Sequence, residues 1–437
     1  MSTIKVLEVL LSIQSVIILT ILIKRFRYHL LSSWFIAGWF VFVNSSFLIS
    51  FLLVGDTSVL YSLPSNYLIV PTTASIETAY YAFFIANTLI ILYKDKSEIK
   101  VSRLKRSQLE YKIGFVIFCF SGFLVGLESI LSVTLGVYKT YSDIYVNGVE
   151  VIPLMKIWNT LYGFSIFIIL SNLEPKRLPK WFYVILIIIG ILQSLGGIRT
   201  YFIVPIGFVL WHSSLFYGLK LSKKKAMLTV VVLIFSIAIL TSIRTSGSTT
   251  TPVSDVIETF SSLSTSVKHL VYYIDMKDEL RSDFPYLFAP FIFPFQYIYY
   301  GSAVIGQSLS SSLLRLDLNH ILSSSININS YYHGAGLGNF FVSESMQYGF
   351  VFLVISLFLL KNLLVFYNKT IQKSRVGRGL SYLIFYSVAF APRSNLFPDL
   401  WPVVKILVML VIFRMILALL RTPSLVVKKT VLSINKK

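Results

Sequence analysis

The sequence predicts an all-α protein that crosses a membrane many times, and three observations lead to this fold class. The chain has 437 residues, of which 55% are hydrophobic and only 13% are charged. Its mean hydropathy of +0.75 is too high for a soluble core of this length, so most of the chain must be solvated by lipid. The apolar residues also occur in runs near the ~20 residues that a bilayer core requires. We therefore expect a polytopic integral membrane protein with about eleven transmembrane helices and one large outer loop.

Each expected span is an apolar run bounded by polar residues. In chain order the spans cover residues 6–23, 30–54, 71–93, 113–137, 154–173, 182–198, 200–219, 226–243, 341–366, 380–396 and 399–420. Three regions follow from this list: 1–243 holds helices one to eight, 244–340 is the large outer loop, and 341–437 holds the last three helices and a basic tail.

The basic residues indicate how the spans are oriented. Lys and Arg are concentrated in every second connection and in the tail, which is the pattern of cytoplasmic loops. The N-terminus is therefore expected outside and the C-terminus inside. Because the net charge of +20 is spread over these short loops, it does not indicate a nucleic-acid partner. The single cysteine, Cys119, lies in an apolar run, and no Cys/His spacing predicts a metal site.

The large outer loop contains one further apolar stretch, 284–310. Treating it as a span would place the basic tail outside, and Pro285, Pro290 and Pro294 would interrupt its helix. We therefore expect a re-entrant or interfacial element there. Before it, 252–271 has the apolar spacing of an amphipathic helix.

Three arginines lie at the outer ends of spans, on the face that is otherwise poor in positive charge. They are Arg199, Arg244 and Arg393. Guanidinium stays charged and offers a fork of donors that matches phosphate oxygens, so we expect the three arginines to hold a diphosphate. Gly196 and Gly197 would let a bulky head group approach the backbone.

A second interpretation needs no ligand. Each arginine could extend its side chain to the membrane interface or pair with Glu77, Glu128 or Asp399. The presence of three arginines on the same disfavoured face favours the binding interpretation.

A second cluster of candidate residues lies in 331–349, between the outer loop and the ninth expected span. Gly334, Gly336 and Gly338 would form a loop that permits close approach. His333 and Glu344 are each a candidate general base, because an attacking sugar hydroxyl must lose its proton. The alternative is an ordinary glycine turn, with His333 exposed and Glu344 near a helix N-terminus.

These segments resemble the Wzy-type O-antigen polymerases, the bacterial oligosaccharide-repeat-unit polymerases. The resemblance rests on Gly-Gly-Ile-Arg-Thr at 196–200, on the 334–349 run, and on Ala-Pro-Arg-Ser-Asn at 391–395. The span count and the large outer loop fit across essentially the whole chain. An arginine followed by ten residues and a glycine is described for the outer loops of some members. Here none of the outer arginines fits it: Arg199, Arg244, Arg281, Arg315 and Arg393 all lack the glycine.

The resemblance implies a function, a substrate and a place. The protein would be a multi-pass glycosyltransferase of the bacterial inner membrane, with its active site and large loop in the periplasm. It would polymerise undecaprenyl-diphosphate-linked oligosaccharide units into surface polysaccharide. Arg199, Arg244 and Arg393 would hold the diphosphate, with Glu344 or His333 as base and with Gly196, Gly197, Gly336, Gly338, Glu128 and Asp399 in support. No cofactor or metal is implied, and a chain-length-regulating co-polymerase is the expected protein partner besides membrane lipid.

Three other classes stay open at this point. An O-antigen ligase would share the lipid-linked donor and the arginines. A flippase or transporter of the lipid-linked unit would show two related halves and broken helices near the midplane, which the sequence lacks. A scaffold protein would not account for the arginines at the outer ends of the spans.

Overall fold

The computed structural model contains helices as its only regular secondary structure over the residues that it describes. Those residues are 2–53, 70–95, 101–102, 104, 106–135, 151–174, 178–195, 199–219, 265–280, 285–304, 307–332, 337–397 and 400–421. The all-α part of the expected fold class is confirmed for this part of the chain.

The first half of the chain forms long helices. They are α1 (Thr3–Arg25), α2 (Leu31–Trp39), the π-helical turn η1 (Phe40–Asn44), α3 (Ser45–Leu53), α4 (Thr73–Leu92), α5 (Gln108–Thr134), α6 (Met155–Ser171), α7 (Lys180–Ser194) and α8 (Arg199–Tyr217). Side-chain caps fix several starts: the Thr72 hydroxyl accepts from the Ser75 amide before α4, and the Ser107 hydroxyl accepts from the Glu110 amide before α5.

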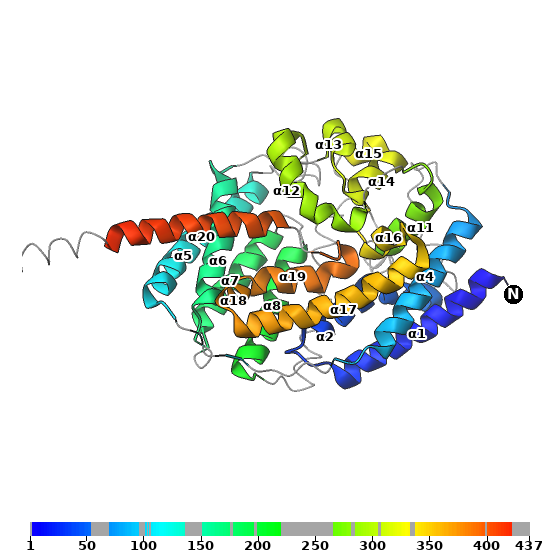
Figure 1. Cartoon of the computed structure of the whole chain (residues 1–437), viewed down its shortest axis with the longest axis horizontal. Coiled ribbons are helices and arrows are strands. Elements are labelled where there is room, and N and C mark those ends of the chain that lie inside the picture. Colours follow the sequence, from blue (N-terminus) through cyan, green and yellow to red (C-terminus); the bar gives the residue numbers. More distant parts are fainter. Residues whose placement is uncertain are drawn as a thin grey trace, which may run out of the picture.

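The second half mixes short and long helices. They are α11 (Thr265–Met276), η4 (Tyr286–Phe288), α12 (Ala289–Tyr300), η5 (Gly301–Val304), α13 (Leu309–Leu314), α14 (Leu318–Ile326), α15 (Ile328–Tyr332), α16 (Phe341–Met346), α17 (Gly349–Lys373), α18 (Arg375–Gly379), α19 (Ser381–Phe390), η6 (Ala391–Arg393) and α20 (Leu400–Arg421). Figure 1 shows α12, α13, α14 and α15 gathered at one edge of the long-helix bundle.

Seven helical stretches in the described residues are long and apolar enough to cross a membrane. They are Thr3–Arg25, Leu31–Ile49, Thr73–Leu92, Gln108–Thr134, Thr200–Tyr217, Gly349–Lys373 and Leu400–Leu419. Helices α6 and α7 are apolar but shorter, with 17 and 15 residues. The expected span 226–243 lies outside the described residues, so the count of eleven stays a prediction.

Two expected spans differ from the helices that the structure shows. The span placed at 341–366 is divided into α16 and α17, because Gly349 adopts a φ of +82° that turns the chain between them. The span placed at 380–396 is the ten-residue α19 followed by the 3-10 turn η6, which contains Pro392.

The two elements expected in the outer loop are partly described. Helix α12 has 12 residues, about 18 Å of rise, which is short of the ~30 Å of a bilayer core. Helix α11 covers the end of the expected amphipathic helix, with Val267 and Leu270 fully buried. The rest of 252–271 lies outside the described residues.

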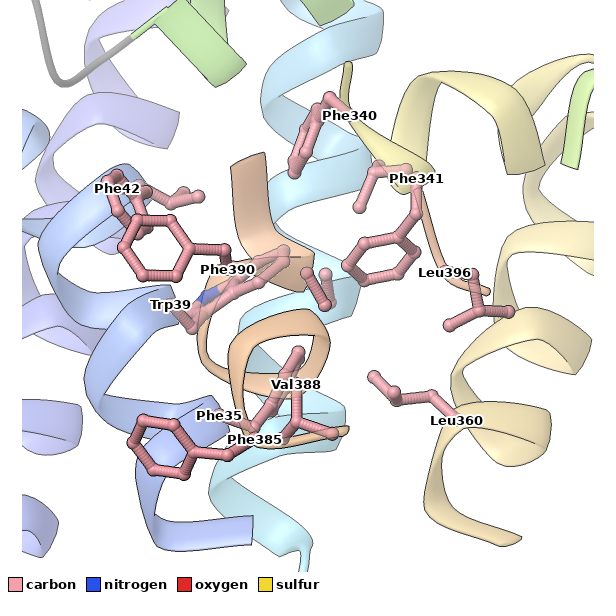
Figure 2. Close-up of a cluster of buried hydrophobic side chains, with 14 of the residues drawn as sticks. Phe35, Trp39, Phe42, Phe340, Phe341, Leu360, Phe385, Val388, Phe390 and Leu396 are labelled. Carbon is pink, nitrogen blue, oxygen red and sulfur yellow. The ribbon is translucent and has the colours of Figure 1, made fainter. Parts of the chain in front are cut away.

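The centre of the bundle is an aromatic core. Phe35 and Trp39 of α2 pack against Phe341, with ring centroids 6.4 and 6.0 Å apart, and Figure 2 shows these side chains in one cluster with Phe385 of α19. The adjacent Phe340 stacks on Phe83 of α4 at 5.8 Å. Because both rings are fully buried, Phe340 and Phe341 fix the polar residues that lie on either side of them in the chain.

Candidate functional site

A cavity of about 300 Å³ lies where α12, α19, the start of α20 and the segments around 315–317 and 394–397 meet. Its polar lining comes from Gln296, Arg315, Asp317, Asn339, Tyr386, Ser387, Ser394 and Asn395. Its apolar lining comes from Ala289, Pro290, Phe293, Leu383, Phe397, Pro402 and Val403. Its volume is at the lower end of the range for small-molecule sites.

An ion pair forms one wall of the cavity. A terminal nitrogen of Arg315 lies 3.4 Å from an Asp317 oxygen, and the two side chains are only 21% and 12% exposed. The guanidinium also lies over the Phe293 ring, with 4.6 Å from the Arg315 Cζ atom to the ring centroid. Asn339 donates its amide to the same Asp317 oxygen at 3.2 Å. Besides their mutual contact, the Phe293 ring therefore positions Arg315 and the Asn339 amide positions Asp317.

The protonation state of Asp317 follows from these contacts. Burial raises the pKa of its carboxyl, but the Arg315 charge, the His320 ring and the hydrogen bonds from Asn339 and Asn319 outweigh burial and bring the pKa below its ordinary value. Asp317 is therefore ionised at neutral pH, and it also caps α14 by accepting from the Asn319 amide.

A second polar layer supports this wall. The His320 ring shares a hydrogen bond of 2.6 Å with the Tyr331 hydroxyl, which lies 3.0 Å from the Ser311 hydroxyl. Burial lowers the pKa of His320 to about 4, so its ring is neutral at neutral pH. This layer joins α13, α14 and α15.

Glu344 lies in a buried polar junction formed by α11 and α16. It is 1% exposed, and its Oε2 atom has no hydrogen-bond partner among the described residues. Burial, followed by the nearby Asp317 charge, raises the pKa of Glu344 well above its ordinary value, so this place favours the protonated carboxyl. The neighbouring Ser343 hydroxyl lies 2.8 Å from Nδ1 of the fully buried His269. His269 Nε2, like Glu344 Oε2, has no partner in this part of the structure.

Two hydrogen bonds connect this junction to η6. The Ser266 hydroxyl donates to the Pro392 carbonyl at 2.7 Å, and the Phe341 amide donates to the Ser394 carbonyl at 3.0 Å. Because Ser394 lines the cavity, the turn that carries Arg393 borders the cavity as well. The structure therefore brings α11, α16 and η6, far apart in the sequence, to one place.

Arg393 is positioned by the π-helical turn η1. Its guanidinium carbon lies 5.9 Å from the centroid of the Phe42 ring. Asn44, also in η1, exchanges hydrogen bonds of 2.9 and 3.2 Å with Asn87 of α4, and all four atoms belong to fully buried side chains. This amide pair stabilises an uncommon helical geometry that points Phe42 toward η6.

Of the other predicted site residues, three lie in described parts of the chain and six do not. Arg199 is the first residue of α8, and the structure describes its backbone but not its side chain. Gly338 has a φ of +74° and open space where a side chain would be. Glu128 accepts hydrogen bonds from the amides of Val151 and Ile152 at 2.9 and 2.6 Å, which anchor the start of the next segment. Six further predicted residues lie outside the described residues: Gly196, Gly197, Arg244, His333, Gly336 and Asp399.

Sequence reasoning missed several polar residues of this region. Arg315, Asp317, Asn339 and Asn395 line the cavity, and His269 faces Ser343. One signal was available for Arg315 and Asp317: they are an Arg-x-Asp pair inside a largely apolar stretch of the outer loop. Asn395 was named as part of a motif and not as a site residue. Within the described residues no group of three His, Cys, Asp or Glu side chains could hold a metal ion.

Comparison with known proteins identifies the family. Neither the curated proteins nor the solved structures contain a match to the chain. A family model described as O-antigen polysaccharide polymerase Wzy matches residues 1–422, nearly the whole chain. Together with the apolar helices, this match makes the chain a multi-pass membrane protein. The chain therefore belongs to the O-antigen polysaccharide polymerase Wzy family.

Proposed function

We propose that this protein elongates a surface polysaccharide from oligosaccharide repeat units linked to undecaprenyl diphosphate, on the periplasmic face of the inner membrane. The observation that carries the proposal is the position of Arg393, on a turn that borders a polar cavity within an apolar helical bundle of a Wzy family member. A chain-length-regulating co-polymerase is the protein partner that we propose with it.

The proposed reaction moves a glycan between two lipid carriers. The hydroxyl at the non-reducing end of an incoming unit forms a bond to the anomeric carbon of the growing glycan. The bond from that carbon to the diphosphate oxygen breaks, and the electron pair leaves with undecaprenyl diphosphate. Arg393, with Arg199 and Arg244, would stabilise the departing charge.

The proton of the attacking hydroxyl needs an acceptor. We propose Glu344 for this role, with His333 as the alternative residue. A carboxyl whose pKa is raised by burial is a stronger base once it is ionised, which favours proton transfer from a sugar hydroxyl.

The first experiment is a gel of surface lipopolysaccharide from cells that lack this gene, beside the same cells complemented with it. A single short rung, core plus one repeat unit, is expected in the deletion strain. Absence of every rung with accumulated lipid-linked polymer would instead indicate a ligase, and lipid-linked monomers trapped inside would indicate a flippase.

Complementation with arginine variants tests the proposed diphosphate contacts. Arg199→Ala, Arg244→Ala and Arg393→Ala should each abolish the ladder while the protein stays in the membrane. Arg106→Ala is the matched control, because Arg106 pairs with Glu174 at a partly exposed position away from the cavity. A full ladder in all three variants would contradict the diphosphate assignment.

A further inference from the structure

We propose that the cavity between α12, α19 and α20 is a subsite for one uncharged sugar ring, and that Asp317 excludes acidic sugars from it. The inference rests on the proposed function only for the source of the sugar. The chemistry of the subsite is argued from the lining itself.

The charge of the described lining disfavours a diphosphate as the occupant. Among the described residues that line the cavity, Arg315 is the single cation and Asp317 the single anion, so their formal charges cancel. The Asp317 carboxylate would repel a phosphate or a sugar carboxylate at short range in this poorly solvated place. A neutral, hydroxyl-rich ligand meets no such repulsion.

Two polar atoms of the lining residues have no hydrogen-bond partner among the residues that the structure describes. One is an acceptor, the buried Oδ1 atom of Asn395, and the other is a donor, the buried Nε atom of Arg315. Buried polar groups are nearly always hydrogen-bonded, so an occupant that both donates and accepts suits this pair. A sugar hydroxyl does both, whereas a diphosphate only accepts.

The apolar lining suits the faces of a sugar ring. Phe293 and Phe397 line the cavity, and Phe397 is held by Phe288 and Phe291 with ring centroids 5.7 and 4.8 Å away. Fixed aromatic rings offer flat surfaces on which the C–H face of a pyranose can stack. At about 300 Å³ the cavity has room for a sugar ring but not for a whole repeat unit.

The position of the cavity would place a bound sugar ring close to Arg393, the proposed diphosphate contact. Ser394 lines the cavity and directly follows Arg393 in the chain. A ring bound here therefore lies beside the proposed diphosphate position, so the subsite would select the sugar closest to the reacting bond.

Saturation-transfer NMR on the full-length protein in nanodiscs tests the subsite directly. The probes are methyl glucoside, methyl galactoside, methyl N-acetylglucosaminide, glucuronate and inorganic pyrophosphate. At least one neutral glycoside should receive saturation, glucuronate should not, and pyrophosphate should leave the glycoside signal unchanged. Displacement of the glycoside by pyrophosphate would overturn the proposal, as would the absence of binding by every neutral glycoside.

Two variants with matched controls assign the binding to the cavity. Asn395→Leu should weaken glycoside binding about ten-fold, because it removes the unpartnered acceptor. Asn368→Leu is its control, since Asn368 is a buried amide on α17, away from the lining, whose side-chain oxygen and nitrogen also lack partners among the described residues. Equal binding by both variants would contradict the role of Asn395.

The second variant tests the selectivity against acidic sugars. Asp317→Asn should admit glucuronate, because an amide keeps the helix cap but loses the charge. Asp275→Asn is its control, because Asp275 joins α11 to α4 through Thr72 and Ser75 outside the cavity. Continued exclusion of glucuronate by Asp317→Asn would contradict the assignment of selectivity to this carboxylate.

The outcomes separate this inference from the proposed function. A deletion strain that keeps its polymer ladder contradicts the proposed function, while neutral-glycoside binding in the same preparation still supports the subsite. A lost ladder combined with no glycoside binding contradicts the subsite alone.

Discussion

His269 illustrates how a single buried residue can make stability depend on pH. Burial lowers the pKa of its ring to about 3, while an unfolded chain would protonate it near pH 6.5. Between these values the unfolded state binds the extra proton. The contribution of the neutral ring is therefore complete above about pH 6.5 and is lost as the pH falls toward 3.

The prediction is a loss of stability in mild acid that depends on His269. Between pH 7 and 4.5 the protein should lose about 2 kcal/mol of unfolding free energy through this residue. His269→Gln should reduce that loss, measured by thermal unfolding in detergent across the pH series. Glu344 acts in the opposite direction, because its raised pKa favours the folded state as the pH falls. An unchanged pH profile in His269→Gln would contradict the prediction.

Glu344 supports a second prediction at the scale of one residue. Glu344→Gln should lower polymer formation at least about 100-fold if this carboxyl is the base. The variant should fold normally at neutral pH, because glutamine has the shape and charge of the protonated carboxyl that burial favours. His333→Ala should keep part of the activity in the same assay. The reverse pattern would assign the base to His333.

The sequence predicts some of these site residues and misses others for a physical reason. Arg393 and Glu344 are charged residues at the ends of apolar runs, which makes them visible without a structure. The Arg315–Asp317 pair lies in the outer loop, where charge is ordinary. Its burial results from contacts with α12 and Asn339, which are too distant in the sequence for a pattern to reveal.

At the scale of elements, close helix contacts depend on a few glycines. Gly38 of α2 lies against the backbone carbonyl of Ala389 at the end of α19, so an added methyl group would overlap a main-chain atom. Gly163 of α6 has open space around the same position. The two glycines therefore form a matched pair for one substitution.

We expect opposite effects from alanine at these two sites. Gly38→Ala should destabilise the protein by about 1–3 kcal/mol, because the α2–α19 contact must separate. Gly163→Ala should be neutral or stabilising by up to about 1 kcal/mol, because alanine favours the helix. Thermal unfolding in detergent and the polymer ladder measure both effects. Comparable destabilisation by the two variants would contradict the packing argument.

Element boundaries were predictable only where composition changes at the boundary. Helix α1 ends at Arg25, directly after Lys24, and the expected span ends two residues earlier, at Ile23. The division between α16 and α17 falls inside an apolar stretch, where hydropathy gives no indication of the positive φ of Gly349. The π-helical turn η1 likewise leaves no mark in hydropathy, since it depends on Asn44 meeting Asn87.

At the scale of the whole molecule, the basic segments meet at one end of the bundle. Arg375 of α18 binds both Glu110 of α5 and Asn172 after α6. Arg378 is 3% exposed and donates to the Ser102 carbonyl. The segments that the charge pattern placed on the same side are thus in direct contact.

This arrangement leads to a topology prediction. In a Cys119→Ser background, which removes the single cysteine, Lys277→Cys after α11 should react with a membrane-impermeant maleimide in spheroplasts. Lys373→Cys at the end of α17 should react only after the membrane is opened. Both positions are exposed in the folded chain, so their reactivity reports sidedness. The reverse labelling would invert the proposed orientation.

The contacts at the basic end also bear on the kinds of motion that this chain can make. The Ser102 amide donates to the Gln372 carbonyl of α17, and the Ser102 carbonyl accepts from Arg378 of α18. Hydrogen bonds therefore join the segment before α5 to both helices. A protein that opened this end of the bundle during alternating access would have to break and remake these hydrogen bonds in every cycle. An enzyme that binds its substrates and releases its product on one side of the bilayer can keep these hydrogen bonds through every turnover.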